Sequence, residues 1–187
     1  MRMIWLLVPF LLVIIACSSE VGSEMNPDML DEEVDFPYAI PELDDYLITA
    51  VDVAPRHGTA ERVDLYYVHE EEVGRNRQLM EMEEGFEAEF DIRRVYGPYD
   101  DFSEFSLVMI QSPEPFHEPY KNEVEVDGQM FQYTISASGE KGMLTFQTAK
   151  DGIYLDVSIK QEEDHMPESE VIEKISRFYS EFADQFE

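Results

Sequence analysis

Apolar and polar residues alternate along several stretches of the chain after residue 46. In 153–160 every odd position is Ile, Leu or Val, and every even position is Tyr, Asp, Ser or Lys. A period of two is typical of a β-strand with one buried and one wet face, as in an antiparallel sheet. We therefore predict strands here and in three further stretches that alternate in the same way, namely 63–67, 86–92 and 131–136. A fifth predicted strand, 105–110, is apolar on both faces because of Val108 and Ile110.

Turn residues divide the second half of the chain into hairpins. Asp127-Gly128 and Asp151-Gly152 each suit a type I′ turn, which needs positive φ at both central positions. Residues 138–142, which include two glycines, supply a third connection. These turns predict a four-stranded antiparallel meander over residues 123–160.

The apolar period changes to three and four residues after Pro167. Proline in the first turn and acidic residues close to it favour the start of a helix there. An aromatic stripe on such a helix must be buried, either on the sheet, which we favour, or against a partner. The chain is therefore predicted to be α+β, with a curved antiparallel sheet covered by a long C-terminal helix. The candidate core or interaction residues on the stripe are Ile175, Phe178, Phe182 and Phe186.

Four segments of this region resemble the LolA-type lipoprotein-carrier fold, in which a strand pair, a turn and a final strand lead into one last helix. The resemblance is distant and implies an architecture more than a substrate. It also implies an alternative function, a carrier that holds an apolar ligand in a cavity between sheet and helix. The segments are Val126-Asp127-Gly128, Leu144-Thr145-Phe146, residues 151–155 and the stretch from Pro167 to Tyr179.

The N-terminus has the form of an export signal. Arg2 precedes the uninterrupted apolar run 4–15, and a positive end followed by a short apolar run is typical of secretory signals. A transmembrane helix needs about 20 apolar residues, and Pro9 within this shorter run disfavours an unbroken helix. We therefore predict a removable signal peptide over residues 1–16.

The signal ends in Ile14-Ile15-Ala16-Cys17, which resembles the bacterial lipobox. The resemblance implies that the Cys17 thiol receives diacylglycerol, that the signal is cut after Ala16, and that the new N-terminus is acylated. Several acyl chains anchor a protein stably where a single chain is marginal. The prediction is a lipoprotein on the extracytoplasmic face of the cell membrane, attached by lipid on Cys17 and without any other cofactor.

Residues 17–35 are rich in acidic residues, serine and glycine and contain few apolar residues. Such a composition predicts a flexible, self-repelling tether that begins at the lipidated Cys17. The remaining residues, 36–187, have a length suited to one domain.

Charge excludes one class of partner. The chain has 42 Asp and Glu against 13 Lys and Arg, a formal net charge of −29. Nucleic acid is excluded as a partner, because neutralising phosphates requires a basic face. The negative charge also opposes adsorption to anionic lipid. Because the acids are spread over the whole chain, we favour general solvation as their role over recognition of a basic partner.

Motifs for catalysis or metal binding are missing from the sequence. None of the histidines lies in an HExxH-like arrangement, and a single cysteine excludes both a disulfide within the chain and a cysteine zinc site. We therefore expect no catalytic residue and no metal ligand. The histidines are His57, His69, His117 and His165.

Two tyrosines stand on the polar faces of predicted strands, Tyr66 and Tyr154. Such rings line a peptide or glycan groove in some proteins and pack across strands in others. With no catalytic motif, the predicted function is a non-catalytic binding module of the cell envelope. Its predicted partner is another envelope protein.

Overall fold

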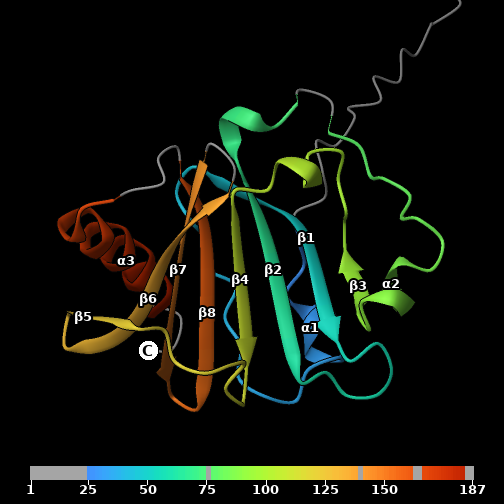
Figure 1. Cartoon of the computed structure of the whole chain (residues 1–187). Helices are drawn as coiled ribbons and strands as arrows, with labels where there is room; N and C mark the ends of the chain where they lie inside the picture. Colours follow the sequence, from blue (N-terminus) through green and yellow to red (C-terminus); the bar gives the residue numbers. More distant parts are fainter. Residues whose placement is uncertain (1–24, 75–76, 139–140, 162–165, 184–187) are drawn as a thin grey trace, which may run out of the picture.

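Eight strands form one sheet in the computed structural model, which describes residues 25–74, 77–138, 141–161 and 166–183 (Figure 1). The strands are β1 (Tyr46–Ala54), β2 (Arg62–His69), β3 (Arg93–Tyr96), β4 (Leu107–Ser112), β5 (Asn122–Val126), β6 (Gln129–Ser138), β7 (Lys141–Lys150) and β8 (Ile153–Gln161). The helices are α1 (Asp28–Asp31), α2 (Phe86–Glu89) and α3 (Glu168–Ala183), with 3-10 turns η1 (Glu70–Glu72) and η2 (Phe102–Glu104).

The strand order in the sheet is β3-β1-β2-β4-β8-β7-β6-β5, and every neighbouring pair is antiparallel. The predicted meander is confirmed, because β5 to β8 are neighbours in chain order. The first four strands join it through β4, which pairs with β8 from Leu107↔Ile159 to Ser112↔Tyr154. The fold is α+β, as the hydrophobic pattern predicts.

Both predicted Asp-Gly turns have the backbone that a type I′ hairpin requires. Asp127 and Gly128 have φ of 51° and 79°, and Asp151 and Gly152 have φ of 53° and 85°. Positive φ is uncommon for a residue with a side chain, and aspartate tolerates it better than most. These two turns set the pairing register of β5 with β6 and of β7 with β8.

The long helix α3 packs its aromatic stripe on the meander. Ile175 and Phe182 are fully buried and Phe178 is 4% exposed. The Phe178 ring lies 5.6 Å from the ring of Phe146 on β7, in an edge-to-face arrangement. The three described stripe residues therefore belong to the core, and Phe186 lies outside the described residues.

A segment assigned to the tether is folded. Leu30 in α1 is fully buried, and Val34 and Phe36 join the same core cluster as the sheet residues. The tether prediction is therefore wrong for residues 25–35, because these apolar side chains cover sheet surface that α3 does not reach. The rest of the predicted tether, with Cys17, and the predicted signal with Ala16 lie outside the described residues.

Hydrogen bonds fix the chain after α1 to the middle of the sheet. The buried side chain of Gln111 on β4 accepts a hydrogen bond from the Ala39 N–H (2.8 Å) and donates one to the Ala39 carbonyl (2.6 Å). The Tyr67 hydroxyl on β2 donates to the carbonyl of Pro41 (3.2 Å). The Gln111 side-chain amide thus pairs with the backbone of Ala39 as a neighbouring strand would. It satisfies the Ala39 N–H and carbonyl, which would otherwise be buried without hydrogen-bond partners.

The predicted strand over 86–92 is wrong. Its first half is the short helix α2, and β3 begins only at Arg93. Gly85 and Asp91 have φ of 91° and 51°, so left-handed residues bound the segment and break an extended backbone. Ile92 is buried, but Phe90 remains 56% exposed, because the alternation does not match one face of the sheet.

The buried position of Phe178 predicts that Phe178→Ala destabilises the fold. Truncating a buried Phe costs about 3–5 kcal/mol, and a chain of this size loses roughly 2–4 °C of melting temperature per kcal/mol. Thermal melts should therefore show a drop of roughly 10 °C. Glu173→Ala, on the exposed side of α3, is the control and should melt like the native chain. An unchanged melt for Phe178→Ala would show that α3 is not packed on the sheet.

The burial of Leu30 predicts that α1 contributes to global stability. Leu30→Ala should lower the free energy of unfolding by about 2–5 kcal/mol, the usual cost of removing a buried leucine side chain. Met29→Ala is a matched control, because Met29 precedes Leu30 in α1 and is 42% exposed. Urea denaturation of both variants measures the difference. Equal midpoints for the two variants would mean that residues 25–35 act as a tether after all.

Candidate functional site

A row that is polar at all but one position crosses the second face of the sheet, the face opposite α3. Period-two alternation places these side chains away from the core, and strand register brings them side by side across neighbouring strands. Asp52 on β1, Asp64 on β2 and Asp156 on β8 are only 1%, 4% and 6% exposed. A buried carboxylate needs a partner. Across the sheet the row runs Asp52, Asp64, Ile110, Asp156, Gln147 and Gln132.

Arginines pair with the first two aspartates. Arg94 donates to both oxygens of Asp52, from Nη2 to Oδ2 over 2.8 Å, and its guanidinium lies 4.7 Å from the centre of the Phe102 ring. Arg62 contacts Asp64 over 2.8 Å and 3.0 Å. Burial still raises the pKa of both carboxyl groups, to about 6 for Asp64. In both pairs the cation is an arginine, which stays charged. We therefore assign the two pairs to stabilisation of the fold.

A third arginine fastens the segment before β3 to β1. Arg77 donates to Asp101 over 2.6 Å and to the Ile48 carbonyl over 2.6 Å. Its guanidinium also lies 4.1 Å from the centre of the Tyr99 ring. The Thr49 hydroxyl donates to the same aspartate. The arginine clusters thus hold the connection between β2 and β4 against the sheet.

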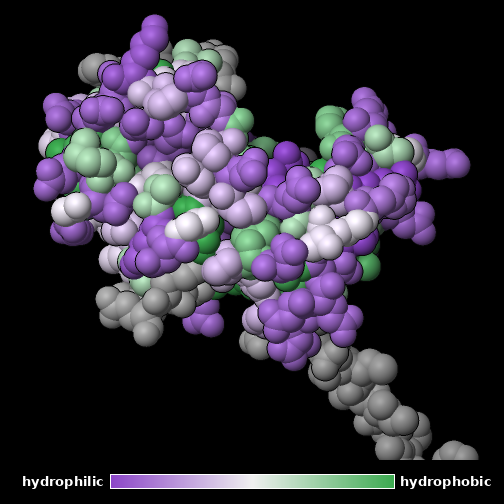
Figure 2. Space-filling model, turned by 90° about the horizontal axis from the view of Figure 1, so that it is seen from below, coloured by the Kyte–Doolittle hydropathy of each residue, from purple (hydrophilic) through white to green (hydrophobic). Residues whose placement is uncertain are grey.

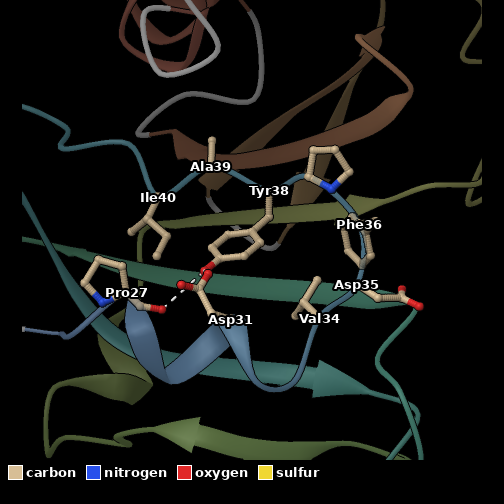
Figure 3. A pocket seen from close by; sticks show the side chains of 9 residues that line it. Pro27, Asp31, Val34, Asp35, Phe36, Tyr38, Ala39 and Ile40 are labelled. Atoms are coloured by element: carbon tan, nitrogen blue, oxygen red, sulfur yellow. Dashed lines mark hydrogen bonds between the residues drawn. The ribbon is translucent and has the colours of Figure 1, made fainter.

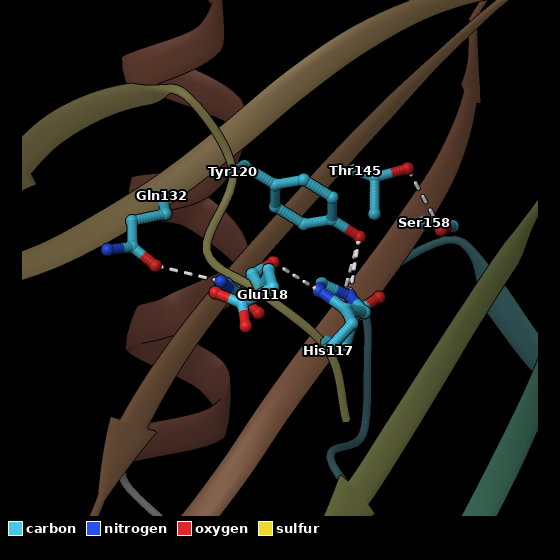
Figure 4. A network of polar contacts seen from close by, with 8 residues as sticks. His117, Glu118, Tyr120, Gln132, Thr145 and Ser158 are labelled. Carbon is cyan, nitrogen blue, oxygen red and sulfur yellow. Dashed lines mark hydrogen bonds and ion pairs between the residues drawn. The ribbon is translucent and has the colours of Figure 1, made fainter. Parts of the chain in front are cut away.

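Asp156 differs, because its partners are His117 and Tyr120, whose side chains point toward each other (Figure 4). Its Oδ2 lies 2.8 Å from His117 Nε2 and accepts a hydrogen bond from the Tyr120 hydroxyl over 3.0 Å. The Tyr120 hydroxyl is also 2.9 Å from His117 Nε2, and His117 Nδ1 lies 2.8 Å from the Glu118 carbonyl. Both partners come from residues 113–121, which connect β4 to β5 and are called the strap below.

The electrostatics of this cluster follow from its geometry. The hydrogen bond to the Glu118 carbonyl is the largest influence and raises the pKa of His117. Burial opposes it, and the hydrogen bond and charge of Asp156 each add a smaller increase. Burial raises the pKa of Asp156, although His117 and Tyr120 counteract it. Burial and the nearby Asp156 raise the pKa of Tyr120. Where His117 is protonated and Asp156 is ionised, the cluster is therefore an ion pair with a neutral phenol.

A pocket of about 600 Å³ lies between the strap and the second face of β5 to β8, within the usual range for small-ligand sites. We call it the strap pocket. Polar and apolar side chains line it, namely carboxylates, amides, aromatic rings and a thioether. They include Phe116, His117, Glu118, Glu123, Met130, Gln132, Gln147 and Tyr154.

Amide groups form a ladder across the floor of the strap pocket. Gln147 donates to the side-chain oxygen of Gln132 over 2.8 Å, and Gln132 donates to the Glu123 carboxylate over 3.4 Å. Amide ladders offer both donors and acceptors at fixed spacing. The arrangement suits recognition of a polar ligand. Among its described contacts, His117 has no serine hydroxyl or thiol partner.

Other hollows of the described chain differ from the strap pocket. One of about 550 Å³ is lined by residues between Pro27 and Ile40, where the Tyr38 hydroxyl bonds Asp31 over 2.6 Å (Figure 3). Another of about 630 Å³ lies beside Tyr46, on the other face of the sheet. The hollow between α3 and the sheet measures only about 90 Å³, well below the usual range for a ligand site. It gives no support to the carrier hypothesis.

The sequence did not predict the cluster of Asp156, His117 and Tyr120. His117 and Asp156 are 39 positions apart in the sequence, and no motif joins them. The only sequence signals were the polar face of 153–160, which includes Asp156, and a histidine set between Pro115 and Pro119. Of the predicted tyrosines, Tyr154 lines the strap pocket, whereas Tyr66 packs against Phe102 and Phe105.

Comparisons with protein-family models, curated proteins and solved structures produced no match. Within the described residues no helix has the length and apolar character needed to cross a bilayer. In the same part of the chain no three His, Cys, Asp or Glu side chains are grouped so that they could hold a metal ion. The site therefore has to be interpreted from its own geometry.

Proposed function

We propose that the chain is a lipid-anchored, non-catalytic binding protein of the cell envelope, with the strap pocket as its binding site. The observation that carries the proposal is this pocket of about 600 Å³, with an amide ladder as its floor and a strap fixed over one side. Convergent polar groups in a hollow with apolar walls are typical of ligand sites. The proposed partner is another envelope protein.

The chemistry of the lining favours a basic segment of that partner. Glu118 and Glu123 line the pocket, and its described lining residues include no lysine or arginine. The chain as a whole carries a net charge of −29, and the surface seen from below is mostly hydrophilic (Figure 2). Complementary charge speeds encounter and selects against acidic competitors. The methylene stem of a lysine or arginine can also lie along Phe116 and Met130.

The proposed anchor is lipid on Cys17, at the end of the lipobox-like sequence. Met25, the first described residue, is eight positions after Cys17. Even a fully extended chain of that length spans at most about 29 Å. A lipidated Cys17 would therefore hold the folded domain close to the membrane, where envelope partners are concentrated.

The proposed binding site predicts position-specific crosslinking in cells. A photo-reactive amino acid in place of Gln147, in the pocket floor, should crosslink one envelope protein through a basic segment. The same replacement at Glu173, on the exposed side of α3, is the control and should give no such product. Adding Glu123→Lys should weaken the Gln147 crosslink by charge repulsion. Mass spectrometry of the crosslinked peptides identifies the segment.

Two outcomes of the crosslinking would contradict the proposal. Equal products from Gln147 and Glu173 would indicate collisions instead of a site. A product from Gln147 that maps to an acidic or apolar segment, and that Glu123→Lys leaves unchanged, would assign the pocket a different ligand chemistry.

The proposed anchor predicts that Cys17→Ser loses lipid. Cells fed a labelled fatty acid should label the native chain and not the variant, because serine has no thiol to accept the diacylglyceryl group. The variant should also move from the detergent phase to the aqueous phase or remain uncleaved. Ser23→Ala is the control and should label normally. Label retained by Cys17→Ser would exclude Cys17 as the anchor.

A further inference from the structure

The strap has few attachments of its own. Three of its residues, Pro113, Pro115 and Pro119, lack an N–H. Within the described hydrogen bonds, no backbone group of residues 113–121 pairs with the backbone of the sheet. At its start the Glu114 N–H donates to the Ser112 hydroxyl over 3.1 Å. The position of the strap therefore depends on side chains.

Those side chains converge on one oxygen. His117 and Tyr120 both reach Asp156 Oδ2, over 2.8 Å and 3.0 Å, and their rings lie 4.7 Å apart. Asp156 is 6% exposed, whereas the His117 side chain is 38% exposed. The buried Asp156 carboxyl on the sheet thus holds the solvent-accessible His117 ring of the strap.

Counting protons gives the state of His117 in this arrangement. Nδ1 faces a backbone carbonyl oxygen, and Nε2 faces a carboxylate oxygen. When the Asp156 carboxyl is ionised, both of these oxygens are acceptors, and a ring nitrogen can donate to either only if it carries a proton. A neutral imidazole has one N–H, and only the imidazolium has two. Only the imidazolium can therefore donate to both oxygens, so this geometry favours the cationic form of His117.

We propose that the strap is a pH-sensitive latch on the strap pocket, closed when His117 is protonated and released when His117 loses its proton. This inference rests on the proposed function, because it assigns regulation to the same site. Loss of the proton leaves the imidazole with one N–H, so it gives up its hydrogen bond either to the Glu118 carbonyl or to Asp156, and the buried Asp156 carboxylate loses its cation in both cases. A buried carboxylate that loses its cation is destabilised.

The described residues around His117 include no second cation that could replace it as the partner of Asp156. On β8 it faces Asp156, and the residues beside Asp156 on β4 and β7 are the uncharged Ile110 and Gln147. On β5 the nearest pocket-lining charge is Glu123. On the strap itself the titratable neighbours are Glu118, Tyr120 and the exposed Lys121, and no described contact joins Lys121 to Asp156.

The direction of the pH effect follows from the two pKa shifts. The pKa of His117 is raised above its ordinary value by the closed geometry, so the stabilisation is complete below about 6.5 and is lost as pH rises through the raised value. The pKa of Asp156 is raised by burial, so the pair also weakens as pH falls through that raised value. The latch is thus closed at mildly acidic pH and opens on the alkaline side.

The experiment follows two probes in the full chain in detergent micelles by nuclear magnetic resonance. Ring signals of His117 report its protonation, and the carbon-13 methyl signal of Met130, which lines the pocket, reports the strap. Met80 is a matched control, because the two methionines are 48% and 49% exposed and only Met130 lines the strap pocket. His117→Gln and Met130→Leu assign the signals.

We expect the Met130 signal to shift with the same midpoint as the His117 ring, above about 6.5, while Met80 stays constant. In His117→Gln the Met130 shift should disappear. In Asp156→Asn the His117 midpoint should fall back towards about 6.5, whereas Tyr120→Phe should keep a coupled transition because the ion pair remains. A Met130 signal that ignores the His117 titration, or that titrates equally in His117→Gln, would overturn the latch.

This measurement needs no ligand, so the two proposals can fail separately. A coupled transition without a Gln147 crosslink supports the latch and contradicts the proposed binding function. A Gln147 crosslink without a coupled transition contradicts the latch and leaves the binding function supported.

Discussion

The apolar face of the sheet is wider than one helix can cover, and the rest of the fold follows from that. Eight strands at about 4.8 Å spacing span roughly 34 Å, whereas a helix with its side chains is about 10–12 Å across. α3 covers the meander half, with Phe178 against Phe146. The segment with Leu30 and Phe36 covers the other half. Without this segment, several valines and leucines of β1 and β2 would face water.

The second face poses the opposite problem, because its buried groups are charged. Asp52 and Asp64 are neutralised by arginines, whose guanidinium stays charged at every physiological pH. Asp156 is neutralised by His117, whose imidazole gains and loses its proton within that range. Asp52 and Asp64 thus face cations that stay charged, whereas Asp156 faces a group that can lose its charge. That group lies beside the strap pocket, which links the electrostatics of the fold to the proposed site.

Sequence alone determined the elements whose geometry is local. The alternation in 153–160 set both faces of β8, because successive side chains on any strand point to opposite sides. Asp127-Gly128 and Asp151-Gly152 set two turns, because their backbone preferences act within two residues. The stripe on α3 likewise follows from helical periodicity. Each of these patterns needs only a few neighbouring residues, so it can be recognised before the chain is folded.

Tertiary structure decided what depends on residues far apart. Leu30 lies in a stretch with the composition of a tether and is buried only because the sheet offers uncovered apolar surface. The 86–92 stretch alternates like a strand, yet left-handed residues at Gly85 and Asp91 give it a short helix instead. His117 and Asp156 meet because strand order places the strap over β8. Burial and pairing are properties of the assembled sheet, and no local pattern of side chains contains them.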